Sequence, residues 1–350
     1  MNSRISKNNP IDIAFSFIFS NYKPGCFNTR EIQFLSSFLA PQMPSIIHRQ
    51  IRLSFQLLST FLPVSWRLSL LKLIREVRKI TATKIKEPRD CIINKKVIEL
   101  DKLGFKRRKY KQFKAVVCLT YDIDRKVCYN YLDKLIDILC KYNLTATLNI
   151  LTAGEYKIKW AKIENIKNLG FEIGLHGATH DIALGYRNIG YIRLELKNAL
   201  ANIPFKVYGY RAPALCMTPT LLQVITELGF LYDSSLPMTN MYYKSVESCF
   251  PYPLNNKVWE FPVTIQDNTF FLDLKLSQKE ALKKLISIIE AIKLLGGISI
   301  INLHPYIIIN KLAFHYKLLT YLKEQKDILI CTMKDLYDYI QSVIQNSDNL

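Results

Sequence analysis

Short apolar runs alternate with longer amphipathic segments over the last two thirds of the chain. The first run, at residues 115–119, contains neighbouring β-branched residues and no charge, which is typical of a strand buried on both faces of a parallel sheet. In the following segment, at residues 127–142, apolar residues recur at intervals of three and four, and this spacing predicts a helix. The same alternation continues to residue 344.

The whole pattern predicts a parallel α/β architecture, and seven or eight strands favour a distorted (β/α) barrel over an open sheet. The predicted strands are 115–119, 145–151, 171–175, 206–210, 230–233, 258–263, 298–303 and 327–331. The predicted helices are 127–142, one ending at 169–170, 191–201, 219–228, 278–295, 311–324 and 333–344.

The first 114 residues have a different character. Residues 46–80 predict two helices broken near Pro63, which would form either a hairpin packed against the barrel or a helix lying on an anionic membrane surface or lipid-linked substrate. The apolar run at 13–19 lacks the cleavage pattern of a signal peptide, and the uncharged stretch at 53–66 is too short to span a membrane. Residues 81–114, with Lys-Arg-Arg-Lys at 106–109, predict a charged, solvated linker.

The distribution of charge also distinguishes residues 1–114 from the rest of the chain. The formal net charge is +19, and residues 1–114 hold 23 basic and 7 acidic residues, so nearly all of the excess lies there. We therefore expect a basic, mainly helical extension over 1–114, in peripheral contact with an anionic membrane, and a catalytic barrel over 115–345. A non-enzymatic binder of an anionic polymer is the alternative, but no nucleic-acid-binding motif accompanies the bases, so no specific nucleic acid is expected.

Eight cysteines without a C-x-x-C pair are typical of reduced thiols. We therefore expect a cytoplasmic protein, with any membrane contact on the inner face.

Ionisable residues fall where the predicted strands end. Asp122 and Asp124 follow the first strand, His176 and His180 the third, and His304 the strand at 298–303. Because the carboxyl ends of barrel strands meet at one face, these side chains are expected to lie close together. Two imidazoles and one carboxylate form a facial site for a divalent metal, which Asp124, His176 and His180 would supply, and Asp122 would then be free to act as a base. The alternatives are that Asp122 caps the next helix and that the histidines are structural.

Four motifs occur in order along the chain: Thr120-Tyr-Asp-Ile-Asp124, His176-Gly-Ala-Thr-His180, Arg211-Ala-Pro213 and Leu303-His304-Pro305. Together they resemble the polysaccharide deacetylase family, which is the chitooligosaccharide deacetylase homology domain, or carbohydrate esterase family 4. The resemblance covers residue 115 to about residue 344 and implies a metal-dependent amide hydrolase for N-acylated sugars. It implies that Asp124, His176 and His180 bind zinc or a similar divalent ion. It also implies Asp122 as general base, Arg211 as its orienting partner, His304 as general acid and Asp233 as a partner for that imidazole.

The motifs depart from the family pattern in ways that concern the substrate. Ile123 separates two aspartates that are commonly adjacent, Gly177 replaces a serine or threonine, and Ala214 replaces an aromatic residue. The Asp-x-Asp spacing resembles a branch that includes intracellular members and the deformylase of lipid-linked formamido-arabinose. The resemblance therefore implies a deacetylase of a sugar in a glycan or glycan precursor, or else a deformylase or deacylase of a polyprenyl-phosphate-linked amino sugar at the membrane surface.

Several aromatic and acidic residues outside the motifs have two interpretations. Trp259 and Glu260 belong to a barrel strand and would either lie in the core or border the substrate cleft. Tyr242, Tyr243 and Tyr252 would stack on sugar rings in the second interpretation.

Overall fold

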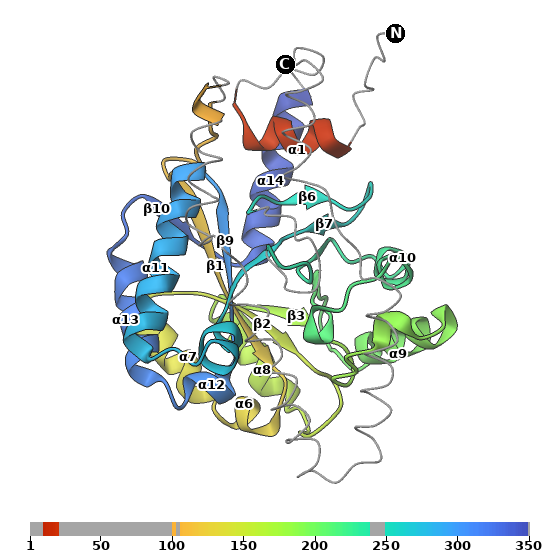
Figure 1. Cartoon of the computed structure of the whole chain (residues 1–350). Coiled ribbons are helices and arrows are strands. Elements are labelled where there is room, and N and C mark those ends of the chain that lie inside the picture. The colour runs from red at the N-terminus through yellow and green to blue at the C-terminus, as the bar shows by residue number, and fades with distance from the viewer. Residues whose placement is uncertain (1–9, 21–99, 103–105, 239–248, 349–350) are drawn as a thin grey trace.

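A computed structural model describes residues 10–20, 100–102, 106–238 and 249–348 of the 350-residue chain. They form one curled sheet with helices packed around its outer side (Figure 1). Among the described strands only the β6–β7 pair is antiparallel, and the order is β6-β7-β5-β4-β3-β2-β1-β9-β8, with β10 pairing with β1. The predicted distorted (β/α) barrel is confirmed. The strands are β1 (Ala115–Ile123), β2 (Thr147–Ile150), β3 (Glu172–Leu175), β4 (Gly209–Tyr210), β5 (Tyr232–Asp233), β6 (Tyr252–Pro253), β7 (Trp259–Glu260), β8 (Val263–Gln266), β9 (Ile298–Leu303) and β10 (Ile328–Ile330).

Main-chain hydrogen bonds join the two sides of the curled sheet. The chain just after β5 reaches β8: the amide of Val263 donates to the carbonyl of Leu236 at 3.0 Å, and the amide of Met238 donates to the carbonyl of Val263 at 2.8 Å. The sheet therefore closes on itself through this short bridge.

Strand β1 lies at the centre of the sheet. Its side chains are all buried, and it pairs with β9 along one edge and with β10 and β2 in turn along the other. The strand extends to Ile123, four residues beyond the predicted end at residue 119, so Asp122 lies within it. A carboxylate is tolerated there because hydrogen-bond donors from β2 and from the chain after β4 reach it, as described below. Asp122 does not cap the next helix, since the residue at that cap is Arg125.

Proline explains where the predicted strand at 258–263 divides. Trp259 and Glu260 form β7 and pair with β5, whereas the chain from Val263 onward forms β8 and pairs with β9. Pro262 lies between them and has no amide hydrogen for a ladder, so the chain changes partner strand at that point.

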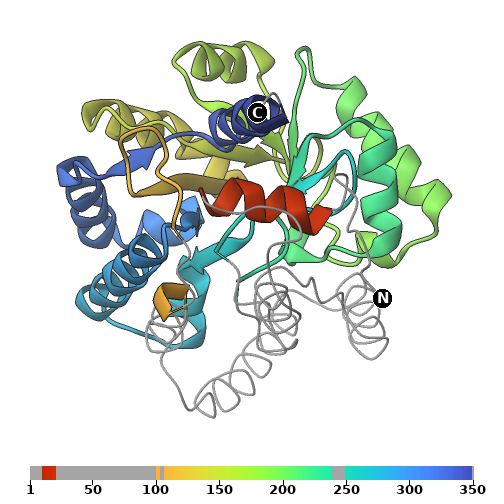
Figure 2. The ribbon, with the colours of Figure 1, turned by 90° about the horizontal axis from the view of Figure 1, so that it is seen from above.

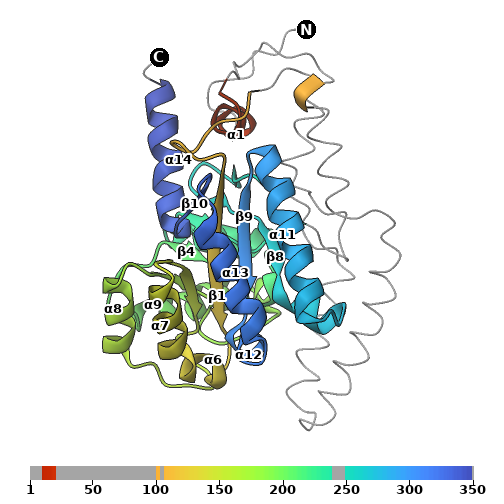
Figure 3. The same cartoon turned by 90° about the vertical axis from the view of Figure 1, so that its left-hand side faces the viewer.

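The helices cover the outer side of the sheet, as the views in Figures 1 and 3 show. The longest, α11, begins with a capping box between Ser277 and Glu280 and ends at Gly296, whose φ of 69° is the left-handed conformation that glycine adopts readily. The predicted helix at 127–142 forms as two, which meet at Tyr131. The helices are α6 (Lys126–Asn130), α7 (Leu132–Lys141), α8 (Trp160–Asn168), α9 (Ile189–Ala201), α10 (Pro219–Glu227), α11 (Gln278–Leu295), α12 (Pro305–Ile308), α13 (Leu312–Glu324) and α14 (Met333–Asp348).

Helix α1 (Pro10–Ile18) lies across one end of the barrel, and Figure 2, which looks down on this end, shows it at the centre of the surrounding helices. Phe15, Phe17 and Ile18 are buried in the same hydrophobic core as β1 and β9. Arg108 holds the helix in place, because its guanidinium donates to the carbonyls of Ser16 at 2.9 Å and of Phe17 at 2.8 Å. The end that α1 covers is opposite to the one where α6 and α12 follow β1 and β9 (Figure 3).

These contacts change the interpretation of the basic extension. The apolar run at 13–19 belongs to the barrel core, and Arg108 from the basic run at 106–109 is engaged with α1, so this part of the predicted solvated linker is structured. Arg107 also forms an ion pair with Asp101 at 2.8 Å. The predicted helical pair at 46–80 lies outside the described residues. Among the described helices, none has the length and hydrophobicity needed to cross a bilayer.

Candidate active site

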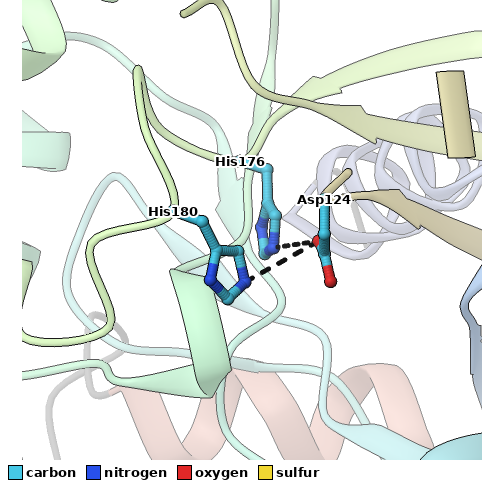
Figure 4. Close-up of side chains that lie close together, drawn as sticks. All are labelled: Asp124, His176 and His180. Carbon is cyan, nitrogen blue, oxygen red and sulfur yellow. Dashed lines mark ion pairs between the residues drawn. The ribbon is translucent and has the colours of Figure 1, made fainter. Parts of the chain in front are cut away.

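Asp124, His176 and His180 converge at the carboxyl end of the sheet, although the first directly follows β1 and the other two lie in the loop after β3. The Asp124 Oδ1 atom lies 3.2 Å from His176 Nε2 and 3.7 Å from His180 Nε2 (Figure 4). The three potential ligand atoms all lie within 4.8 Å of one another. His176 is buried, whereas the side chain of His180 is 34% exposed, so the group is open on one side.

The protonation of His176 is set by a main-chain contact. Its Nδ1 lies 2.7 Å from the carbonyl oxygen of Arg211, which accepts a hydrogen bond, so the Nδ1 atom carries the proton. Its Nε2 faces Asp124 Oδ1, a buried oxygen without a hydrogen-bond donor among the described residues. When Nε2 carries no proton, a cation held by both atoms would satisfy them, so this donor set fits a divalent metal.

The loop between the two histidines depends on glycine. Gly177 has a φ of +100°, and a Cβ atom at this position would lie 3.1 Å from the carbonyl oxygen of Thr179. A residue with a side chain would be strained there, which accounts for glycine in place of the commoner serine or threonine.

Asp122 is held by a fully buried arginine. Its Oδ1 accepts from Arg211 Nη1 at 3.0 Å and from Asn149 Nδ2 at 2.8 Å. Burial by itself raises the pKa of Asp122, but the positive charges of Arg211, His176 and His304 lower it further than burial raises it, and the net shift is downward. Asp122 is therefore an ionised carboxylate at neutral pH.

Arg211 is oriented by neutral partners around the rest of its guanidinium. Its Nη1 also donates to Thr120 Oγ1 at 2.7 Å and to Asn302 Oδ1 at 3.2 Å, while its Nε and Nη2 donate to the carbonyl and hydroxyl oxygens of Ser234, both at 2.8 Å. One arginine thus connects β1, β9 and the chain after β5. The sequence placed Thr120 in the first motif but gave no signal for the roles of Asn302 and Ser234.

His304 follows β9 and faces both aspartates of the first motif. Its Nε2 lies 4.0 Å from Asp122 Oδ2 and 3.9 Å from Asp124 Oδ2. Its Nδ1 lies 2.6 Å from Asp267 Oδ1, and its amide donates to Asp267 Oδ2 at 2.7 Å. Burial lowers the pKa of His304, but Asp267 and the two motif aspartates raise it more, to about 9. The imidazolium form therefore predominates at neutral pH.

The prediction that Asp233 partners His304 is wrong, because Asp267 occupies that place. The Oδ1 and Oδ2 atoms of Asp233 accept from the hydroxyl and the amide of Ser235 at 2.6 and 3.1 Å, and its neighbour across the strands is Glu260. Asp267 comes directly after β8, so the same strand-end signal applies to it. The sequence missed it because the predicted strand ended at residue 263.

Burial decides between the two interpretations of the aromatic and acidic residues outside the motifs. Glu260 and Tyr252 are buried, as is most of Trp259, so the core interpretation holds for Trp259 and Glu260, and Tyr252 is not available to stack on a sugar. Tyr242 and Tyr243 lie outside the described residues.

Residues 109–232 match the family model described as polysaccharide deacetylase. A search of the curated proteins found no match. Solved structures with a similar fold include a protein of Mycobacterium smegmatis assigned to the polysaccharide deacetylases, with 20% identity and a TM-score of 0.55 over 66% of this chain and 91% of that one.

Two further solved structures share the fold. A protein of Pseudomonas aeruginosa PAO1, also assigned to the polysaccharide deacetylases, has 13% identity and a TM-score of 0.53 over 67% of this chain and 94% of that one. Puue allantoinase has 13% identity and a TM-score of 0.54 over 66% of this chain and 91% of that one. The matched segment contains Asp122, Asp124, His176, His180 and Arg211. Residues 109–232 therefore resemble the polysaccharide deacetylases, and the chain shares its fold with two solved structures assigned to that family.

Proposed function

We propose that this protein is a metal-dependent hydrolase that removes an N-acyl group, most simply N-acetyl, from a sugar in a glycan or glycan precursor. One observation carries the proposal: the Nε2 atom of His176 and a buried carboxylate oxygen of Asp124 face each other at 3.2 Å, beside the ionised Asp122 and the charged His304. A hydrolase that activates water and protonates an amine leaving group needs this combination.

The metal would be held by Asp124, His176 and His180, and zinc is our candidate because two imidazoles and one carboxylate suit it. When bound, such an ion supplies Lewis acidity to the acyl carbonyl and to a water molecule. The Nδ1 hydrogen bond from His176 to the Arg211 carbonyl fixes the ring orientation and leaves Nε2 as the ligand atom.

Asp122 is our candidate general base. Its hydrogen bonds from Arg211 and Asn149 both engage Oδ1, which leaves Oδ2 on the side that faces His304. This carboxylate takes a proton from the attacking water as the new C–O bond forms. Arg211 orients it and keeps it ionised.

His304 is our candidate general acid. Asp267 accepts from Nδ1 and stabilises the imidazolium, so the Nε2 proton is available for the nitrogen of the leaving amine. The C–N bond then breaks, and the products are a carboxylate and a free amino sugar. Without this proton the tetrahedral intermediate would return to substrate.

The decisive test combines metal analysis with product detection. We expect about one zinc or similar ion per chain in the purified protein, and acetate release from N-acetylhexosamine substrates that falls about a hundredfold or more in Asp122→Asn. Asp133→Asn, at an aspartate whose side chain is 73% exposed, is the matched control and should retain full activity. Protein that binds no divalent ion and releases acetate or formate from no N-acyl sugar would refute the proposal.

The cytoplasmic location and the contact of residues 1–114 with an anionic membrane stay predictions. Most of the basic residues that suggest this contact lie outside the described part of the chain. Cofractionation with anionic vesicles at low salt, lost at high salt, would support the contact.

A further inference from the structure

An exposed arginine lies next to the metal-ligand group. Arg125 follows Asp124 directly and precedes α6, and its guanidinium carbon lies 4.7 Å from the ring centroid of Tyr306. The Tyr306 ring is in turn 5.5 Å from the ring of the candidate acid His304. Because α6 and α12 follow the paired strands β1 and β9, this cation lies at the edge of the site.

Arg125 has no acidic partner in the part of the chain that the structure describes. No described carboxylate forms an ion pair with it, and its one recorded side-chain contact is the face of Tyr306. Glu155, which reaches the next residue, accepts a hydrogen bond from the amide of Lys126 at 3.3 Å. A guanidinium that stacks on an aromatic ring is restrained by it while its N–H donors remain available to a ligand.

The cations inside the site already face protein groups. Each of the three guanidinium nitrogens of Arg211 donates to protein atoms, and the His304 ring faces Asp267, Asp122 and Asp124. An anionic group on an N-acyl sugar therefore needs a cation that no described carboxylate occupies. Arg125 is such a cation, and a guanidinium binds phosphate and carboxylate oxygens in pairs.

We propose that Arg125 and Tyr306 form an anion-binding subsite, which recognises a phosphate or carboxylate group carried by the N-acylated sugar. The inference rests on the proposed function and narrows its substrate class to anionic amino sugars. The guanidinium carbon of Arg125 lies 4.7 Å from the ring centroid of Tyr306, and that ring lies 5.5 Å from the ring of His304, so the anionic group belongs to the sugar that is deacylated or to its direct substituent.

Binding measurements test this subsite without relying on turnover. We would titrate zinc-loaded Asp122→Asn protein, in which hydrolysis is suppressed, with N-acetylglucosamine, its 1-phosphate, its 6-phosphate and N-acetylgalactosaminuronic acid. The two phosphates and the uronic acid distinguish a phosphate from a carboxylate ligand. We expect at least one anionic sugar to bind about ten to a hundred times more tightly than N-acetylglucosamine, and Arg125→Gln to remove this advantage.

Lys126→Gln is the matched control, because it removes the same charge from the next exposed residue, which has no recorded ring contact. It should change the affinity for the anionic sugars by less than about threefold. Tyr306→Leu should weaken the binding of the anionic sugar, while Tyr306→Phe retains it.

Two results would overturn the subsite: anionic sugars that bind no better than N-acetylglucosamine, or equal losses in Arg125→Gln and Lys126→Gln. These outcomes are separable from failure of the proposed function. Arg125-dependent binding without acyl release by the wild type would remove the hydrolase and leave the subsite. Acyl release at the same rate from neutral and anionic sugars would support the hydrolase and remove the subsite.

Discussion

Asp233 and Glu260 form a buried carboxyl pair, and Asp233→Asn is expected to change how the free energy of unfolding depends on pH. The two residues are neighbours in the parallel register of β5 and β7, and both are fully buried. Burial is the main cause that raises the pKa of Asp233, to about 6 from an ordinary value of 3.8, and the pKa of Glu260 lies well above its usual range for the same reason.

The sign of the effect follows from the raised pKa. The folded protein holds the Asp233 proton more tightly than the unfolded chain does. The contribution of this protonation to the free energy of unfolding is therefore fully present below pH 3.8 and is lost as the pH rises through about 6. A difference of about two pKa units corresponds to about 3 kcal/mol. Asparagine does not titrate, so the variant lacks this pH-dependent decrease in the free energy of unfolding. The cost of replacing one hydrogen-bond acceptor of Ser235, about 1–3 kcal/mol, is independent of pH.

Urea unfolding between pH 4 and pH 7.5 would measure this effect. We expect wild type to lose up to about 3 kcal/mol relative to Asp233→Asn across this range, whatever the offset between the two proteins at pH 4. Asp133→Asn, at an exposed position, should run parallel to wild type. A difference between wild type and Asp233→Asn that stays constant with pH would refute the assignment of Asp233 as a buried, late-titrating acid.

Three further predictions concern the site and the core. Asp267→Asn should lower kcat for acyl release at pH 7.5 about a hundredfold or more, because His304 loses the carboxylate that stabilises its charged form; an unchanged rate with unchanged zinc content would contradict this. Zinc should raise the unfolding temperature of wild type in a calorimetric scan but not that of Asp124→Asn, and equal shifts would exclude Asp124 as a ligand. Phe17→Ala should destabilise the protein by about 3–5 kcal/mol in urea unfolding, whereas Leu194→Ala, at a 60% exposed position, should cost less than about 0.5 kcal/mol. Equally small effects of the two substitutions would show that α1 is not part of the core.

Hydrophobic patterning predicted most of the barrel, because its central strands are buried on both faces and read as apolar runs. β9 and α11 begin and end at the predicted residues. The pattern missed the two-residue strand β6, and it failed where a proline divides a run, as at Pro262. It also failed for α1, whose apolar residues cover one end of the barrel and whose place depends on Arg108, a residue 91 positions away.

Side-chain chemistry was predictable where a motif supplied it at the end of a strand. Asp122, Asp124, His176 and His304 were placed in this way, and the structure brings them together. Asp267 obeys the same rule and was missed only because the end of β8 was misplaced. Asp233 also follows the rule, yet its carboxylate turns to Ser235 and Glu260, since a strand end shows where a side chain begins and not which partner it reaches.

Arg211 shows why the rest of the site was beyond sequence reasoning. Its side chain holds the Asp122 carboxylate, a role that a motif can suggest, because charge and size belong to the residue type. Its carbonyl oxygen fixes the protonated nitrogen of His176, and any residue would supply that oxygen if the chain passed through the same point. The role proposed for the Nε2 atom of His176 therefore depends on the path of the main chain between β4 and the following turn. This path is set by the pairing of Leu175 with Tyr210, and only coordinates reveal it.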